Sequence, residues 1–267
     1  MILWNATGAA IIQPPYFYCI AKSKATSRDP TIPLNEAISL FMTTIPALLC
    51  PLLLFVPVWL NYSTWSHHGF IAIFHVSPIL VILIFIAGVI ILLPRHGLVS
   101  KKDAKNPDAD KPWIVASYVT AGIVSSVVHI ATVLTSLRTV SSDATFARVF
   151  IPSPGRANLF PSWFPNPAST LSGLPTKYVE LLEQYHLFTQ FDLIVIALSC
   201  IVFVHALLPN TRGDDAKFGP KTKAAIEKRE LAYLFLGTLV IGPGGAGSFA
   251  LAIRESRIRE HAEVKGQ

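Results

Sequence analysis

Charged residues are scarce in this chain: Asp, Glu, Lys and Arg make up only 14% of its 267 residues, whereas soluble domains carry about a quarter. Hydrophobic residues make up 52%, and the mean hydropathy is +0.50. A soluble domain covers its core with polar side chains, and this chain has too few of them. The scarcity of charge therefore excludes a soluble globular protein and predicts an integral membrane protein.

Cysteine is also rare, and its placement gives no sign of a disulfide framework. The three cysteines, Cys19, Cys50 and Cys200, all lie in apolar segments without the paired spacing of a zinc site. We interpret them as packing residues. The basic residues, which give a net charge of +6, are spread between apolar segments rather than gathered on one face, so we expect no nucleic-acid partner.

The motifs of common soluble enzymes are absent, with no nucleophile elbow and no P-loop. Residues 242–247 match a dinucleotide-binding glycine pattern, but they lie inside an apolar segment rather than between a strand and a helix. Small residues there let helices approach closely or let a helix break. Asp103, Asp108 and Asp110 lie close together but lack the spacing of membrane prenyltransferase motifs. We therefore expect no metal and no cofactor.

Long apolar segments are what the chain has in abundance. About 20 apolar residues are enough for a helix to cross the hydrocarbon core. We predict an all-α fold, a polytopic transmembrane helix bundle of six or seven spans that forms one domain over residues 1–267. The predicted spans cover residues 2–21, 37–60, 70–93, 113–137, 187–208 and 231–253.

The distribution of Lys and Arg predicts the orientation of these spans. With six spans, the loops at 22–28, 95–111 and 212–229 share one side and carry fourteen basic residues, which places them in the cytosol. The basic C-terminal tail then lies on the wrong side. A seventh span within 138–186 would bring the tail inside but move the 212–229 loop out. Glycosylation sequons at Asn5 and Asn61 face the lumen in this arrangement, so we expect the membrane of the endoplasmic reticulum.

The longest connection, residues 138–186, is rich in proline and aromatic residues. Its last part, 174–185, is compatible with a short amphipathic helix. We interpret the connection as a long interfacial loop lying on the membrane surface. The alternative is a cap over the mouth of a cavity, because lids are often drawn from long loops.

Asp192 is the one carboxylate inside the apolar run at 187–208. An acid exposed to lipid costs about 2.5 to 3.5 kcal/mol on insertion scales, so such residues usually face a bundle interior and mark a function. Desolvation keeps a proton on a carboxyl group near neutral pH, which suits protonation of an unactivated substrate. The alternative is a structural bond to another helix. The helical neighbours of Asp192 on the same face are Tyr185, Phe188, Thr189, Val195, Ile196 and Ser199.

Three further polar residues are candidates for the same cavity. Glu36 lies in an expected first helical turn, where a carboxylate is favoured by the helix dipole, so a structural role competes with a catalytic one. His75 and His129 lie within predicted spans, where each either forms an interhelical hydrogen bond or lines the working cavity.

The chain resembles the small integral-membrane terpene cyclases of fungal meroterpenoid pathways, in particular the ascofuranone and ascochlorin cyclases. The resemblance rests on residues 13–18 (QPPYFY), on Asp29-Pro30 with Pro33, on 190–192 (QFD), and on 242–244 (GPG) ahead of Arg254-Glu255. It implies a bundle without metal that starts cyclisation of a farnesyl chain by protonating an epoxide or an alkene. Two cavity acids are implied, and Asp192 matches the later one by context.

The leading hypothesis is therefore a terpene cyclase in which Asp192 donates the initiating proton and Glu36 assists. Tyr16, Tyr18 and Tyr185 are candidates to line the cavity or stabilise a carbocation through their rings. The expected partners are a farnesylated small molecule and the lipid bilayer, and the sequence does not indicate an oligomeric state. The alternatives are a proton-coupled transporter that uses Asp192 and the membrane histidines, and a membrane scaffold held together by Asp192.

Overall fold

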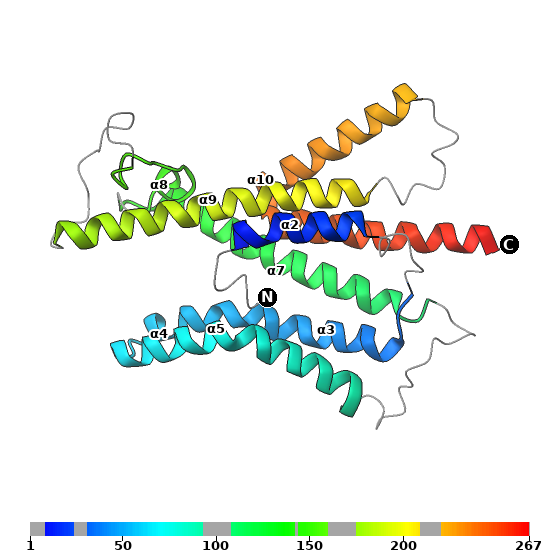
Figure 1. The fold of residues 1–267 in the computed structure, drawn as a ribbon, viewed down its shortest axis with the longest axis horizontal. Coiled ribbons are helices and arrows are strands. Elements are labelled where there is room, and N and C mark those ends of the chain that lie inside the picture. Colours follow the sequence, from blue (N-terminus) through cyan, green and yellow to red (C-terminus); the bar gives the residue numbers. More distant parts are fainter. Residues whose placement is uncertain are drawn as a thin grey trace.

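The computed structural model of the chain is a bundle of helices (Figure 1). It describes residues 9–23, 31–92, 108–141, 144–159, 175–208 and 220–266, and these residues contain no strand. Five helices are long and apolar enough to cross a membrane. The predicted all-α membrane bundle is therefore confirmed. Residues 1–8, which include the sequon at Asn5, and Asp29, Pro30 and Asp103 lie outside the described residues.

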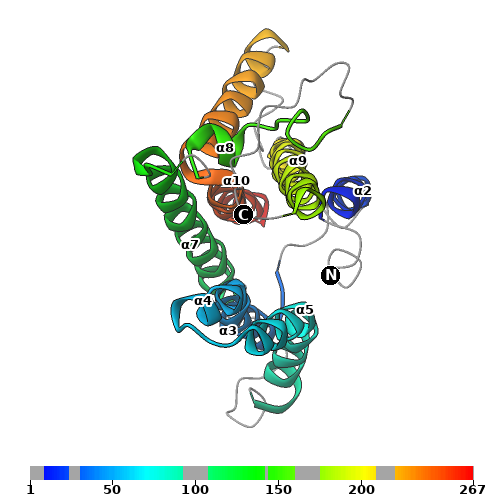
Figure 2. The same ribbon diagram turned by 90° about the vertical axis from the view of Figure 1, so that its left-hand side faces the viewer.

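The bundle has two halves joined by one helix. α2 (Ala9–Lys22) packs against α9 (Thr176–Leu207), and α9 also packs against α10 (Pro220–Gly266). In the other half, α3 (Leu34–Leu49) packs against α5 (Thr64–Ala87). α7 (Lys111–Arg138) contacts both α10 and α3. Viewed along the bundle, the helices follow an open arc with α7 between the two halves (Figure 2).

Proline shortens the second apolar segment. The segment predicted as one span over 37–60 consists of α3, a 3-10 turn (Cys50–Leu54) and the short α4 (Val56–Trp59). Pro46 lies within α3, whereas Pro51 and Pro57 lie at the starts of the next two elements. Proline lacks a backbone donor and fits best in a first helical turn, so each of these two residues opens a new element.

α9 is longer than the predicted span. It runs without a break over 32 residues, so the amphipathic helix expected at 174–185 is the first part of this helix and not a separate surface element. The predicted interfacial loop at 138–186 therefore ends about ten residues early. Its described part contains one short helix, α8 (Phe146–Phe150).

α10 is broken at Gly242, which is one of the two alternatives that the small residues there allow. Gly242 has φ 79° and ψ 160°, a conformation open only to glycine, and a Cβ atom would lie 2.8 Å from Cγ of His129. Beyond the break the chain turns back, because Arg257 Nη1 lies 3.5 Å from Glu230 Oε1 although 27 residues separate them. A straight helix would hold these residues about 40 Å apart. α10 is thus a helical hairpin, and Figure 1 shows both arms leaving the turn toward one end of the molecule.

The hairpin removes the conflict in the predicted topology. The 212–229 segment leads into the first arm and the basic tail continues the second, and both arms leave the turn toward the same end of the bundle (Figure 1). The prediction of a single crossing over 231–253 is therefore wrong, since the segment turns back at Gly242. The described ends of the helices that flank the other basic segments then lie toward one end of the molecule, which agrees with the prediction that these segments share one side of the membrane (Figure 1).

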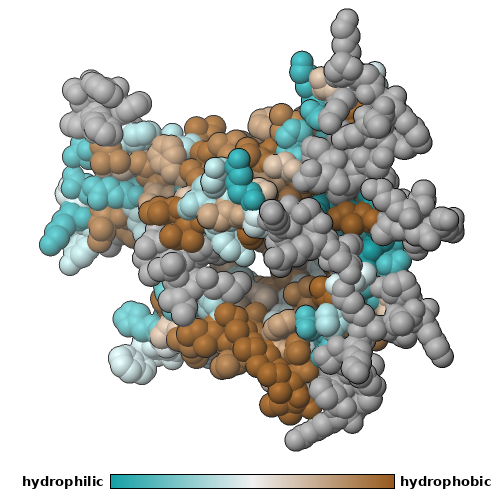
Figure 3. Space-filling model, turned by 45° about the vertical axis from the view of Figure 1, so that its right-hand side comes forward, coloured by the Kyte–Doolittle hydropathy of each residue, from teal (hydrophilic) through white to brown (hydrophobic). Residues whose placement is uncertain are grey.

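The outer surface of the bundle is apolar. Figure 3 shows hydrophobic side chains covering much of the lower half, where α3 and α5 lie, and a face hollowed between the two halves. Only 6% of the apolar window of α5 is buried inside the protein. Large exposed side chains such as Ile73, Leu80 and Leu83 lie along this helix. Such a surface is stable in contact with lipid rather than water.

Candidate functional site

The candidate site lies between α2 and α9. The face of α9 that carries Asp192 also carries Ser199, about two helical turns later, and this face packs on α2. Gln13 of α2 is only 6% exposed, and its Nε2 donates to Ser199 Oγ at 3.0 Å and to the Ile196 carbonyl at 3.3 Å. Further along, the rings of Phe17 and Phe203 stack with centroids 4.2 Å apart. The interface thus begins polar and becomes aromatic.

Asp192 lies at the N-terminal end of α2. Its Oδ1 accepts a hydrogen bond from the backbone N–H of Ala10 at 2.7 Å. Backbone donors are unpaired in a first helical turn, and the helix dipole favours a negative charge there. Within the described part of the chain this is the one hydrogen bond of the carboxyl group, and it leaves Oδ2 available. The structure therefore supports a structural bond without excluding a chemical role for the second oxygen.

An apolar groove of about 680 Å³ follows the α2–α9 interface. Along α9 it begins at Val195, one turn beyond Asp192, and includes Ser199. Tyr18, one of the predicted cavity residues, lines it from α2, and the ammonium group of Lys22 lies 5.8 Å from the Tyr18 ring centre. The remaining lining residues are Pro14, Phe17, Ala21, Leu198, Val202, Phe203 and Ala206. Such a surface suits an extended hydrocarbon chain.

The other predicted aromatic and hydroxyl residues are not gathered in this groove. Tyr16, Tyr185 and Phe188 have exposed side chains. The Thr189 hydroxyl donates to the carbonyl of His186 in its own helix at 2.7 Å. The face predicted around Asp192 is therefore continuous in α9, but the described residues of α2 cover only its later part.

The two predicted membrane histidines make backbone contacts. Nδ1 of His75 lies 2.8 Å from the Ile71 carbonyl in its own helix. Nε2 of His129 lies 3.2 Å from the Leu239 carbonyl, and its ring faces Gly242 at the turn of the hairpin. The interhelical interpretation of His129 is supported by this bond, which ties α7 to the broken helix.

Glu36 is not brought close to Asp192. It lies in the first turn of α3, as predicted, and its side chain is partly exposed. α3 packs on α5 and α7, whereas α9 packs on α2 and α10. No hydrogen bond or ion pair between Glu36 and Asp192 is present among the described residues. The two acids proposed from the sequence therefore do not form a pair in this structure.

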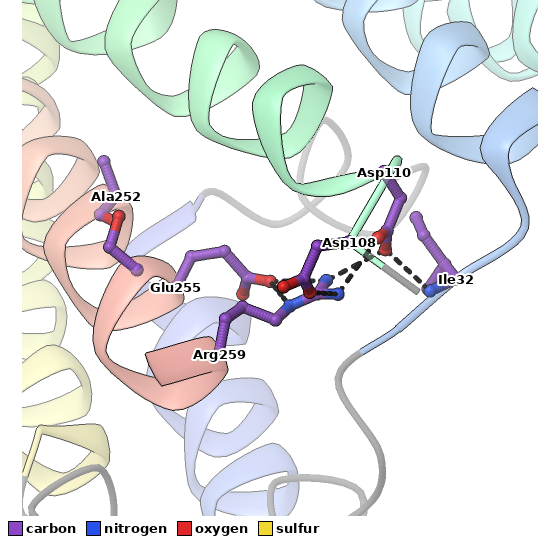
Figure 4. Close-up of polar contacts among 7 residues, drawn as sticks. Ile32, Asp108, Asp110, Ala252, Glu255 and Arg259 are labelled. Carbon is purple, nitrogen blue, oxygen red and sulfur yellow. Dashed lines mark hydrogen bonds and ion pairs between the residues drawn. The ribbon is translucent and has the colours of Figure 1, made fainter. Parts of the chain in front are cut away.

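The sequence-based reasoning missed a buried ionic cluster around Arg259 (Figure 4). Arg259 is 1% exposed, and its guanidinium donates to Asp110 at 2.9 and 3.0 Å, to Glu255 at 2.8 and 2.9 Å, and to Asp108 at 3.1 Å. Asp110 Oδ2 also accepts from the backbone N–H of Ile32 at 2.8 Å. The cluster joins the second arm of α10 to the start of α7 and to the chain entering α3.

One signal for this cluster was visible in the sequence. Asp108 and Asp110 are acids only two residues apart, and from the sequence alone we consider them only as metal ligands. The described residues contain no group of three side chains able to hold a metal ion. The cation that these carboxylates bind is Arg259, which lies 149 residues beyond Asp110. It belongs to the basic tail, whose charges we interpret from the sequence only as determinants of membrane orientation. Only the fold brings the two segments together.

Comparison with known proteins places this architecture in a family. The chain is 43% identical to the terpene cyclase DEP1 of Fusarium langsethiae over 262 residues, which are 97% of this chain and 68% of that protein. It is 42% identical to the terpene cyclase DEP1 of Alternaria brassicicola over the same shares. No solved structure matches the chain. The resemblance to fungal membrane terpene cyclases is thereby confirmed at the level of the family. Residues 1–259 match the model of the CtvD domain, and the chain belongs to the CtvD domain family.

Proposed function

We propose that the protein is a membrane-bound terpene cyclase that protonates an epoxide or alkene of a farnesyl chain carried by a meroterpenoid precursor. The observation that carries the proposal is the position of Asp192, an acid at the end of an apolar groove between α2 and α9. The names of the two relatives support the reaction class. The groove accommodates the hydrocarbon chain, and the bilayer supplies it, because exposed apolar side chains such as Leu198 and Val202 line the groove.

The bond between Asp192 and Ala10 suits a general acid. In the protonated carboxyl group, Oδ1 accepts the Ala10 N–H while Oδ2 carries the proton. Transfer of that proton to the substrate leaves a carboxylate next to a backbone donor and the positive end of the α2 dipole. The same donor and dipole stabilise the carboxylate that the transfer leaves behind. Proton loss from the final cation makes the product an isomer of the substrate.

The walls of the groove suit the cation that protonation creates. The aromatic rings of Phe17, Phe203 and Tyr18 line it, and ring faces attract positive charge. Apart from Lys22 and Ser199 the rest of the lining is apolar, so few water molecules can compete to quench a carbocation before the rings close.

The test compares the wild type with Asp192→Asn in microsomes given farnesyl-aryl and epoxyfarnesyl-aryl substrates, with products identified by mass spectrometry. Asparagine keeps a carbonyl oxygen that can accept the Ala10 N–H but has no acidic proton. We expect cyclised isomers from the wild type and a rate lower by about 10²- to 10⁴-fold for the variant. Glu180→Gln, on the same helix but outside the apolar run, is the matched control. Full activity of Asp192→Asn would refute the proton-donor role.

A second candidate function is favoured by the broken helix. Discontinuous helices that meet within the membrane are typical of secondary transporters, and α10 has such a break against His129. A proton-coupled transporter would use Asp192 and the membrane histidines. Solute flux driven by a pH gradient in proteoliposomes, with no isomerisation of any prenylated substrate by folded protein, would favour this function over cyclisation.

A further inference from the structure

The described part of the long connection, residues 144–159, is held in place by side chains of α9. Gln190 Nε2 donates to the carbonyls of Arg148, Val149 and Ile151 at 2.8, 3.3 and 3.2 Å. Nε2 of His186 also lies 2.7 Å from the Arg148 carbonyl. Buried backbone groups need such partners, and here side chains of a long helix supply them. The segment is therefore preorganised rather than a loose surface loop.

The same helix also fixes the side chain of Arg148. Arg148 Nη2 lies 2.6 Å from Glu183 Oε1, and the two side chains are only 9% and 3% exposed. The second carboxylate oxygen of Glu183 is buried without a hydrogen-bond partner. A buried charge is tolerated when it is paired, and this pair neutralises Arg148 while holding its guanidinium in one orientation.

A second guanidinium shares a cavity with this pair. The cavity has a volume of about 260 Å³, and its polar lining consists of Arg148, Arg156 and the hydroxyl-bearing residues Thr145 and Ser153. Arg156 has no side-chain hydrogen bond or ion pair with any residue that the structure describes. Glu180, the other acid of α9 near this segment, lies 3.5 Å from the amide of Asn158. The lining of the cavity contains two guanidinium groups and no carboxylate, and among the described residues Glu183 pairs with only one of them, that of Arg148.

The cavity lies beside the part of α9 that precedes its apolar run, a position that suits the depth of lipid headgroups. Figure 1 shows α8 beside the first part of α9, toward the end of the molecule opposite the C-terminus. That part of α9 carries Lys177, Glu180 and Glu183 and precedes the apolar run. Arginine presents a planar fork of donors that matches the oxygens of a phosphate, and it is the preferred residue where such an anion is bound away from bulk water.

We propose that Arg148 and Arg156 form a binding site for a phosphate group, presented by the headgroup of a membrane phospholipid. Arg156 supplies the uncompensated charge, and Arg148 presents the guanidinium nitrogens that Glu183 does not engage. The site is separate from the α2–α9 groove, since Gln190 and Asp192 point to different faces of α9, toward α8 and toward α2. A lipid bound here would fasten the long connection to the membrane surface.

The test uses the purified full-length protein in a neutral detergent, titrated separately with phosphatidic acid, diacylglycerol and inorganic phosphate. Bound lipid is counted by native mass spectrometry, and the shift in melting temperature is recorded. Arg156→Gln removes the unpaired charge without exposing Glu183. Arg138→Gln, which changes an exposed arginine at the end of α7 near the start of the same connection, is the control.

We expect phosphatidic acid to bind the wild type and the Arg138→Gln protein, and to bind Arg156→Gln about tenfold more weakly, as loss of one charge-assisted contact predicts. Diacylglycerol, which has no phosphate, should not bind at this site. An equal shift with inorganic phosphate alone would show that the site takes free phosphate and overturn the assignment to a lipid. Retention of phosphatidic acid by Arg156→Gln at wild-type affinity would overturn the phosphate site itself.

Discussion

The contact between α7 and α10 and the contact between α2 and α9 use polar residues in opposite ways. In the first, Arg259 is buried and bonded to three carboxylates. Its bonds to Asp108 and Asp110 join α10 to the start of α7, and its bond to Glu255 lies within α10. In the second, Asp192 has one backbone partner among the described residues and lies next to an apolar groove. A saturated charge has no capacity left for a ligand, whereas a carboxyl group with a free oxygen beside a cavity has. The number of hydrogen-bond partners of a charged side chain therefore distinguishes a structural charge, such as Arg259, from a candidate catalytic one, such as Asp192.

The sharpest test of this contrast is Arg259→Met. It removes the shared partner of Asp110 and Glu255 and leaves buried carboxylates without a cation, which typically destabilises a protein by about 3–5 kcal/mol. We expect a large fall in melting temperature of the detergent-solubilised protein and in the yield of folded protein.

The control is Arg257→Met, on the same arm of α10. The Arg257 side chain is 42% exposed, and its contact with Glu230 is 3.5 Å, so a loss of about 0–1 kcal/mol is expected. If the two variants melted at the same temperature, the Arg259 cluster would not hold the hairpin to α7.

Gly242→Ala should come next in magnitude. Alanine strongly disfavours φ 79°, and its Cβ would lie 2.8 Å from the His129 ring. We expect a loss of about 1–3 kcal/mol, the range for one residue forced into a sparsely populated backbone region. The matched change is Gly69→Ala in α5, where a Cβ would meet no atom within 4 Å. That change should stabilise the helix by about 0.5–1 kcal/mol, and thermal melts that rank the two variants alike would contradict the hairpin.

Asp192→Leu and Asp192→Asn separate the two roles of this residue. Leucine loses the acceptor for the Ala10 N–H, as when a helix cap is removed, for a loss of about 0.5–2 kcal/mol. Asparagine should keep that stability, and both variants should lose cyclisation. Melting temperature and product formation measured on the same preparations test this. A large loss of stability for Asp192→Asn would favour a scaffold function instead.

Glu36→Gln should have the smallest effect. The carboxylate interacts with the dipole of α3, a contribution of about 0.3–1 kcal/mol, and the structure gives it no contact with Asp192. We expect a slight fall in melting temperature and a far smaller change in turnover than for Asp192→Asn. Equal losses of turnover would show that Glu36 assists the proton transfer after all.

Local pattern predicted most of the helices, and long-range contacts decided the rest. The span at 113–137 corresponds closely to α7 because its apolar residues are not interrupted. The acid at Asp192 stood out because a carboxylate is rare in such a run. The reversal at Gly242 was harder to foresee, since a glycine within an apolar segment is compatible with a straight helix. The ion-pair partners of Asp110 and Arg148 could not be predicted from the sequence, because Arg259 and Glu183 lie 149 and 35 residues away along the chain.

The turn at Gly242 also bears on how the chain is made. A segment that crossed the bilayer once would require the arginine-rich end of the protein, with Arg254, Arg257 and Arg259, to be translocated, and each arginine at the membrane centre costs about 2.5–3.5 kcal/mol on insertion scales. A hairpin enters and leaves by the same side. During synthesis the two helical arms can then be inserted together from one side as a single unit, and the arginine-rich end of the second arm never has to pass through the membrane.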